Sequence, residues 1–155
     1  MCTGIALDRC EIPDSLVDEY GLTTTSRGAE SSPEVQVRYQ DKKARLPVWL
    51  DGQLQILTWG NRDDKQSRLP RTGWARRESV EDGKWKWLRP EKVTIPASYG
   101  LEKGVWFAIT EGMEGLVVLD EQKLPHVDML TQPASHYYQT MTRHERMPIL
   151  LGDQI

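Results

Sequence analysis

A succession of short β-prone runs, separated by turn-forming residues, is the feature that most constrains this fold. Runs of this length, rich in branched and aromatic residues, are typical of strands. The predicted strands are 35–39, 46–50, 54–59, 85–88, 93–96, 105–110, 116–119, 127–130 and a final buried strand at 148–151. Asp51 and Gly52 lie between two of these runs and predict a hairpin.

The segments between the runs are shorter and mostly polar. We expect short helices at 13–20, beginning near Asp14 or Ser15, and at 133–142, entered through Thr131. We expect surface loops at 22–34 and 61–72. Together these elements predict one domain spanning 1–155. Its fold is α+β and β-rich, a small antiparallel barrel-like sheet with a few short helices.

Composition excludes several function classes. A chain of 155 residues that is 38% hydrophobic and 28% charged is an ordinary soluble domain. No apolar run reaches the roughly 20 residues that span a bilayer, so no membrane partner is expected. Cys2 and Cys10 are too few for a disulfide framework, no spacing indicates a metal site, and no cofactor is expected. We expect a cytoplasmic, monomeric protein.

The net charge of −3 argues against a chain that binds nucleic acid over its whole surface. Residues 38–77, however, carry ten Lys or Arg against four Asp or Glu, a local balance of +6 that leaves −9 for the remainder. Such a segment can face phosphates, and a solvated surface explains it equally well.

Cys2 is the most reactive residue of the sequence if Met1 is removed. One residue then carries a free α-amine beside a thiol. The amine condenses with an aldehyde, and the thiol closes on the imine carbon to give a five-membered thiazolidine. The alternative, which its position alone does not exclude, is that Cys2 has no chemical role.

Several separated segments resemble the SRAP (SOS response-associated peptidase) family, whose members crosslink to abasic sites in single-stranded DNA. The family begins Met-Cys, has a Trp-Gly element and an Asn-Ala-Arg-Ala-Glu-Thr element, and later a conserved Ile-Pro-Ala segment and a His-Asp-Arg-Met-Pro string. The matching segments here are Met1-Cys2, Trp59-Gly60, Trp74-Ala75-Arg76-Arg77-Glu78-Ser79, Ile95-Pro96-Ala97 with Glu102, Thr131-Gln132-Pro133-Ala134, and His144-Glu145-Arg146-Met147-Pro148.

The chain departs from the family pattern at three places. Thr3 and Gly4 replace the usual Gly-Arg, Glu30 aligns with an Asn beside the reactive cysteine, and Lys103 replaces a Trp. The nucleophile, glutamate and histidine are all retained. The resemblance therefore implies an SRAP-type, lyase-like activity with possible self-removal of Met1. Its partner would be single-stranded DNA containing abasic sites, with association to the nucleoid when bound.

The resemblance assigns the roles of individual residues. Cys2 is the nucleophile, Glu102 shuttles the proton of the carbinolamine, and His144 helps to open the sugar ring. Among the predicted DNA-binding residues, Arg76 binds a phosphate, and Arg77 points to the opposite face of the same stretch. Thr131 contacts the sugar. Glu78 orients a neighbouring arginine, and Arg146 braces the His144 segment through an internal salt bridge.

The tryptophans and the two other histidines are interpreted from their neighbours in sequence. Trp49, Trp59 and Trp106 lie in β-prone runs and are expected in the core. Trp74, Trp85 and Trp87 flank polar sequence, and one of them is expected to stack a base. His126 and His136 are expected at the surface or in loops.

Two readings from other classes stay open. Met-Cys-Thr-Gly also opens cysteine N-terminal-nucleophile amidohydrolases, in which the processed cysteine attacks an amide. Those proteins resemble this chain only at its start and are generally larger. The second alternative is a non-catalytic single-stranded DNA-binding module.

Overall fold

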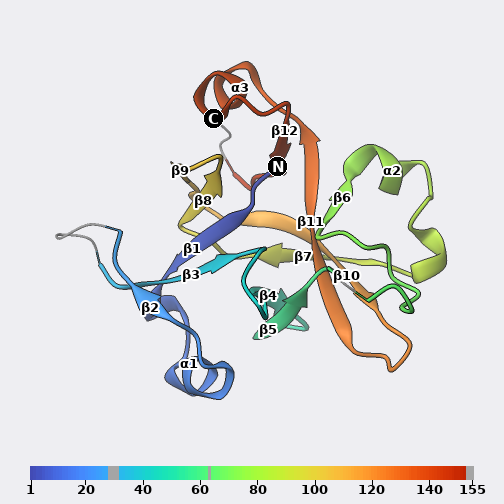
Figure 1. Ribbon diagram of the computed structural model, residues 1–155, viewed down its shortest axis with the longest axis horizontal. Helices are drawn as coiled ribbons and strands as arrows, with labels where there is room; N and C mark the ends of the chain where they lie inside the picture. Colours follow the sequence, from blue (N-terminus) through green and yellow to red (C-terminus); the bar gives the residue numbers. More distant parts are fainter. Residues whose placement is uncertain (28–31, 63, 153–155) are drawn as a thin grey trace.

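The computed structural model describes residues 1–27, 32–62 and 64–152, whose strands form two sheets (Figure 1). The first sheet has the order β2-β3-β1-β8-β9. Its strands are β1 (Gly4–Asp8), β2 (Thr24–Thr25), β3 (Glu34–Arg38), β8 (Tyr99–Glu102) and β9 (Val105–Ala108). The second has the order β10-β7-β4-β5-β11-β12, with β6 beside β11. Its strands are β4 (Arg45–Leu50), β5 (Gln53–Trp59), β6 (Trp74–Arg76), β7 (Glu91–Ile95), β10 (Met113–Leu119), β11 (Pro125–Pro133) and β12 (Arg146–Pro148).

The second sheet closes into a small barrel because β11 also pairs with β10. The ring runs β10-β7-β4-β5-β11 and returns to β10. The predicted β-rich, barrel-like α+β class is therefore confirmed. The sequence predicts an antiparallel sheet, and this part is wrong for two strand pairs. Strand β11 runs parallel to both β5 and β6.

Seven of the nine predicted strands overlap observed strands over most of their length, and 85–88 and 148–151 do not. Asp51 and Gly52 form the predicted β4–β5 hairpin, with φ of 53° and 74°, the left-handed pair that a tight hairpin turn requires. Residues 85–88 are wrong as a strand, because Lys86–Leu88 forms the short helix η2. Trp85 and Leu88 lie three residues apart and are both buried, and a 3₁₀ turn places such residues on one side.

The helices include α1 (Asp14–Tyr20), α2 (Arg77–Glu81), α3 (His136–Thr142) and the short η1 (Arg9–Glu11). The predicted helix at 13–20 is confirmed; it ends at Tyr20 and is capped by Gly21, which adopts a left-handed conformation. The predicted entry of α3 through Thr131 is wrong. Ser135 caps α3 by accepting a hydrogen bond from the backbone N–H of Tyr138, and Thr131 stays in β11. The predicted final strand at 148–151 is wrong except for Pro148, because β12 covers Arg146–Pro148 and Leu150 forms only an isolated bridge with Met113.

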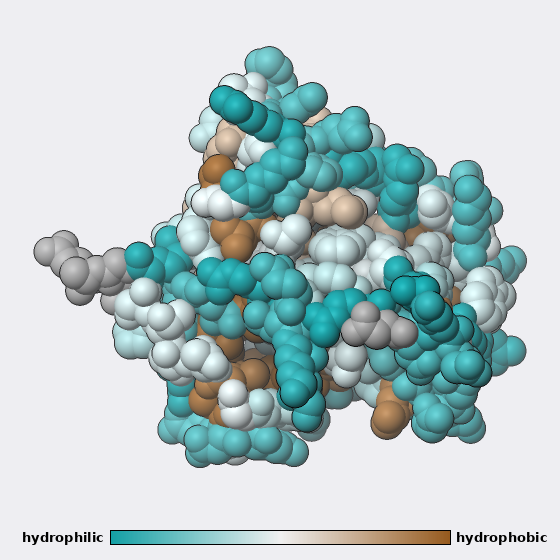
Figure 2. All heavy atoms as spheres, viewed as in Figure 1, coloured by the Kyte–Doolittle hydropathy of each residue, from teal (hydrophilic) through white to brown (hydrophobic). Residues whose placement is uncertain are grey.

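Two clusters of buried side chains hold these elements together. The main cluster joins both sheets and includes Cys2, Trp59 and Tyr138. The second lies under the α2–η2 segment and includes Trp85 and Leu88. Hydrophilic residues cover most of the face drawn in Figure 2, with hydrophobic residues in small separate patches. No helix among the described residues is long and apolar enough to cross a membrane. Glu30 lies outside the described residues.

Asp128 is an unusual member of this interior and yields a prediction about stability. It lies on β11 opposite Leu116, is 3% exposed, and its Oδ1 has no hydrogen-bond partner among the described residues. Burial raises the pKa of this carboxyl well above its ordinary value. The unfolded carboxyl ionises near pH 4 while the native one stays protonated, so this group's contribution to stability falls as the pH rises above about 4.

We expect Asp128→Asn to remove this dependence. Its free energy of unfolding is expected to exceed that of the unmodified chain by about 1–3 kcal/mol at pH 8, with little difference near pH 4. Urea unfolding at both pH values measures the difference, and the exposed Asp18→Asn is the matched control. A gap between the two proteins that does not widen with pH would contradict the assignment.

Candidate active site at the amino terminus

The first residues lie where the two sheets meet. The N-terminus is next to β12 and α3 in Figure 1. The Thr3 N–H donates to the Leu101 carbonyl at 2.8 Å, and the Thr3 carbonyl accepts from the Tyr39 N–H at 3.0 Å. These two hydrogen bonds hold Thr3 between β8 and the end of β3. A cleft of about 460 Å³ opens beside it, lined by Met1, Arg76, Glu78, Thr131, Pro133, Glu145 and Arg146.

An α-amine is held between a buried carboxylate and a histidine. The Met1 nitrogen lies 2.5 Å from Glu102 Oε1 and 2.6 Å from His144 Nδ1, and these two side chains are themselves 3.4 Å apart. Glu102 is 1% exposed. Burial lowers the pKa of the Met1 amine, and the hydrogen bond and charge of Glu102 offset only part of that effect. A larger share of the amine is therefore neutral and nucleophilic than in a free terminus.

His144 is oriented by its own segment. Its Nδ1 faces the Met1 amine and also the backbone N–H of Arg146 at 3.0 Å, with the Arg146 carbonyl at 3.1 Å. Two donors converge on this nitrogen, so we assign it the acceptor role and place the ring proton on Nε2. His144 in this form can accept a proton from the amine.

The Cys2 side chain points inward, away from water. It is 0% exposed, and its Sγ donates to the Gly4 carbonyl at 3.0 Å. Burial raises the pKa of the thiol to about 12. The Cys2 carbonyl accepts a hydrogen bond of 2.9 Å from Trp74 Nε1, whose ring packs against Tyr39 and Trp59 at centroid distances of 4.6 and 5.8 Å.

Arg146 and Glu78 form the wall of the cleft. Arg146 binds both carboxylate oxygens of Glu78, at 2.6 and 3.1 Å, and the carbonyl and hydroxyl of Thr131 at 3.0 and 3.1 Å. The hydrogen bond from Arg146 lowers the pKa of Glu78 to about 2. The internal salt bridge predicted for Arg146 is confirmed, and so is the orienting contact of Glu78, which lies 3.7 Å from Arg76 as well.

The predicted DNA-binding residues are distributed unevenly around the cleft. Arg76 is exposed at its rim, and Thr131 lines it although its hydroxyl already accepts from Arg146. Arg77 does not line the cleft. It begins α2 and donates to Gln132 at 2.7 Å. Trp74 is half-buried, and its indole N–H donates a hydrogen bond to the Cys2 carbonyl, so its ring is not an open stacking surface.

Four other aromatic and histidine predictions need correction. Trp49 is 48% exposed and not in the core, because it points outward from β4, whereas Trp85 is buried in the second cluster. Trp106 is half-buried beneath Arg27 and Arg38. His126 is not a loop residue: it lies on β11, where both ring nitrogens face acceptors, the Gly60 carbonyl at 2.8 Å and Asp120 at 2.9 Å. Trp59 is buried and His136 is exposed, as expected.

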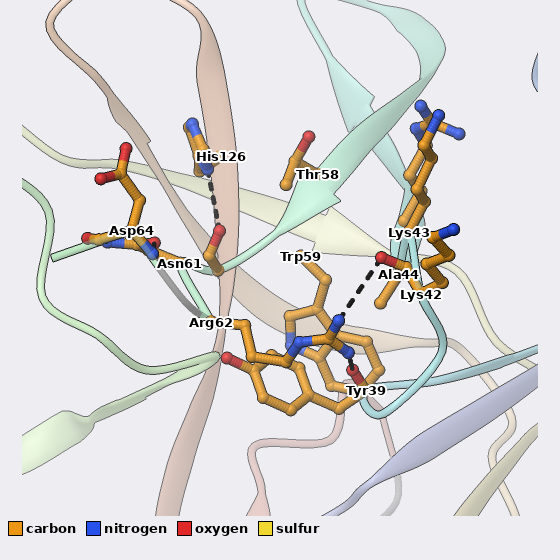
Figure 3. A pocket seen from close by; sticks show the side chains of 12 residues that line it. Tyr39, Lys42, Lys43, Ala44, Thr58, Trp59, Asn61, Arg62, Asp64 and His126 are labelled. Carbon is orange, nitrogen blue, oxygen red and sulfur yellow. Dashed lines mark hydrogen bonds between the residues drawn. The ribbon is translucent and has the colours of Figure 1, made fainter. Parts of the chain in front are cut away.

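Part of the basic segment 38–77 converges on a second pocket (Figure 3). Lys42, Lys43, Arg45 and Arg62 line this cavity of about 290 Å³ together with Asp64. Arg62 donates to the backbone carbonyls of Tyr39 and Asp41, which fixes the loop that carries the lysines. The pocket shares Tyr39 and Trp59 with the aromatic cluster around Trp74.

Sequence reasoning missed one participant of this site. It is the Met1 amine, which lies between Glu102 and His144. Among residues 1–27, 32–62 and 64–152, no three His, Cys, Asp or Glu side chains gather as metal ligands would. Lys103, where the family has Trp, donates to the Arg143 carbonyl at 3.0 Å.

No protein-family model, curated protein or solved structure matches the chain.

Proposed function

We propose that this chain forms covalent crosslinks with abasic sites in single-stranded DNA through Cys2, once Met1 is removed. One observation carries the proposal. An α-amine lies within hydrogen-bond distance of a buried glutamate and a histidine, one residue before a thiol. We infer that the Cys2 amine takes the place of the Met1 amine after processing.

The reaction has three steps, and each has a residue suited to it. His144 assists opening of the closed deoxyribose to its aldehyde. The Cys2 nitrogen adds to the aldehyde carbon, and Glu102 delivers the proton with which the carbinolamine oxygen leaves as water. The sulfur then adds to the imine carbon, the C=N π bond becomes an N–H bond, and a thiazolidine results.

The surrounding charges fit a strand with phosphates on both sides of the lesion. Arg76 is exposed at the rim of the cleft. Its neighbour Glu78 pairs more closely with Arg146 than with Arg76. Lys42, Lys43 and Arg45 lie beyond the Trp74 cluster. Such contacts neutralise the backbone without reading sequence, as a lesion binder requires.

An oligonucleotide with a single abasic site tests the proposal directly. Purified protein, whose intact mass establishes loss of Met1, is incubated with this strand or with the same strand undamaged. We expect a band that survives a denaturing gel only with the abasic strand. Reversible binding to both strands without this band would indicate a non-catalytic module, and turnover of amide substrates would indicate a hydrolase.

Trp87 is the most exposed tryptophan, and we expect it to stack a base. It is 57% exposed, and the guanidinium of Arg68 lies 5.3 Å from its ring centroid. We expect Trp87→Ala to weaken equilibrium binding of an undamaged single strand by about 5- to 160-fold, since one stacked base contributes about 1–3 kcal/mol. Fluorescence anisotropy at low salt measures this affinity.

The matched control for this prediction is Trp49→Ala. Trp49 is exposed to a similar extent but lies beside Glu11 and Glu111 instead of cations. Its replacement is expected to leave the affinity within about twofold. Equal losses for both variants would show that neither ring is a specific platform.

A further inference from the structure

The Met1 amine already lies where the proposed reaction requires a nitrogen nucleophile. Its nitrogen is 2.5 Å from Glu102 Oε1 and 2.6 Å from His144 Nδ1. Burial lowers the pKa of this amine, so a larger share of it is neutral near neutral pH than in a free terminus. Lysine side chains, with an ordinary pKa near 10.4, are almost entirely protonated under the same conditions. A chain that keeps Met1 therefore holds a reactive primary amine beside an acid and a base.

The Cys2 thiol cannot readily capture an imine that forms on the Met1 nitrogen. A peptide bond separates the amine of Met1 from the sulfur of Cys2, so closure would need an eight-membered ring instead of the five-membered thiazolidine. The Cys2 side chain is also 0% exposed, and its Sγ donates to the Gly4 carbonyl at 3.0 Å. An imine on Met1 is therefore left open to a different reaction.

An imine of the abasic sugar can undergo β-elimination. The protonated C=N bond acidifies the adjacent C2′–H, and the phosphate on C3′ is the leaving group. The step needs a base close to the nitrogen, and two groups flank the Met1 amine. The His144 side chain is 24% exposed and the Glu102 side chain 1%, so His144 is the more accessible of the two to a bound sugar. Glu102 is left to pair with the N–H of the protonated imine.

We propose that a chain retaining Met1 cleaves single-stranded DNA at abasic sites, with the Met1 amine as the nucleophile. The inference rests on the proposed function for its substrate. The amine adds to the aldehyde, and the aldehyde oxygen leaves as water to give the imine. His144 removes the C2′ proton, the C2′=C3′ double bond forms, and the C3′–O bond breaks, which releases the downstream strand with a 5′-phosphate.

Water then hydrolyses the imine and closes the cycle. It returns the free Met1 amine and leaves an unsaturated aldehyde at the end of the upstream strand, so one protein molecule can act repeatedly. Removal of Met1 changes this outcome, because the nitrogen and the sulfur then belong to the same residue. The product changes from a broken strand to a stable crosslink.

The unprocessed chain is obtained from a fusion whose protease cuts directly before Met1, and its intact mass verifies the terminus. It is incubated with a 5′-labelled abasic strand and with the same strand after borohydride reduction of the aldehyde. We expect cleavage of the first strand only. Its rate is expected to be at least about tenfold above that of the uncut fusion, which keeps every lysine but has no free Met1 amine. The processed chain is expected to give the crosslink band and little cleavage.

Two further readouts locate the chemistry. Cyanoborohydride is expected to stop cleavage and leave the strand attached to Met1, as mass spectrometry of the terminal peptide shows. His144→Gln is compared with His136→Gln, which replaces an exposed histidine of α3. We expect the ratio of cleaved strand to trapped imine to fall at least about 100-fold in His144→Gln and to change less than about twofold in His136→Gln.

Equal cleavage by the uncut fusion, or an adduct on a lysine instead of Met1, would overturn the inference. It is also overturned if the unprocessed chain leaves the abasic strand intact while the processed chain crosslinks it, and the proposed function then stands without it. If the unprocessed chain cleaves the strand and the processed chain forms no crosslink, the proposed function fails and the role of Met1 is upheld.

Discussion

A processed chain carrying Cys2→Ser is expected to lose the denaturation-resistant crosslink by at least about 1,000-fold, as removal of a nucleophile does in other covalent mechanisms. The serine oxygen is a far weaker nucleophile than a thiolate, and the ring it could close reopens readily. The α-amine is unchanged, so the imine still forms. Denaturing gels with and without cyanoborohydride measure both products, and only the reduced sample is expected to show a band.

The exposed Cys10 provides the control for this variant. Cys10→Ser removes a thiol of the same chain without touching the terminus and is expected to crosslink at the unmodified rate. A Cys2→Ser protein that still traps abasic strands without reductant would show that the amine alone accounts for the product. A form that retains Met1 is expected to behave like Cys2→Ser, because its Cys2 nitrogen lies in a peptide bond.

The β-rich class was predictable because strand signals are local. Alternating apolar runs and a left-handed Asp51-Gly52 turn depend on neighbours in sequence. The closing pair β10–β11 and the parallel pair β5–β11 depend instead on residues far apart in the chain, and no short pattern encodes them. The strand predicted at 85–88 is wrong for a related reason, because these residues form a 3₁₀ turn. Its geometry is set by the second core cluster and not by strand propensity.

The site was predictable only through motifs. Glu102 and His144 meet the amine across sequence separations of 101 and 143 residues, a distance that neither spacing nor composition bridges. Arg146 and Glu78 were assigned correctly because both lie in recognisable strings. The motifs did not predict which side chains are buried. Trp49, expected in the core, is exposed, and Trp85, expected beside polar sequence, is buried.

Glu102→Gln is expected to reduce crosslink formation by about 100-fold or more, the usual contribution of a positioned proton-transfer group. The amide has nearly the same shape, so the buried site stays filled, but it can neither accept the amine proton nor return one to the departing carbinolamine oxygen. Both the imine trapped by cyanoborohydride and the final crosslink are therefore expected to fall together.

Glu145→Gln is the matched control, because Glu145 lines the same cleft and is exposed. It removes an equal charge near the DNA, so any effect of charge on strand binding appears in both variants and cancels in their ratio. Rates measured at saturating DNA, together with thermal melting of each variant, separate the chemical step from binding and from folding. If the two variants crosslink at equal rates, the buried carboxylate serves only to hold the terminus in place, and the proton must travel through His144.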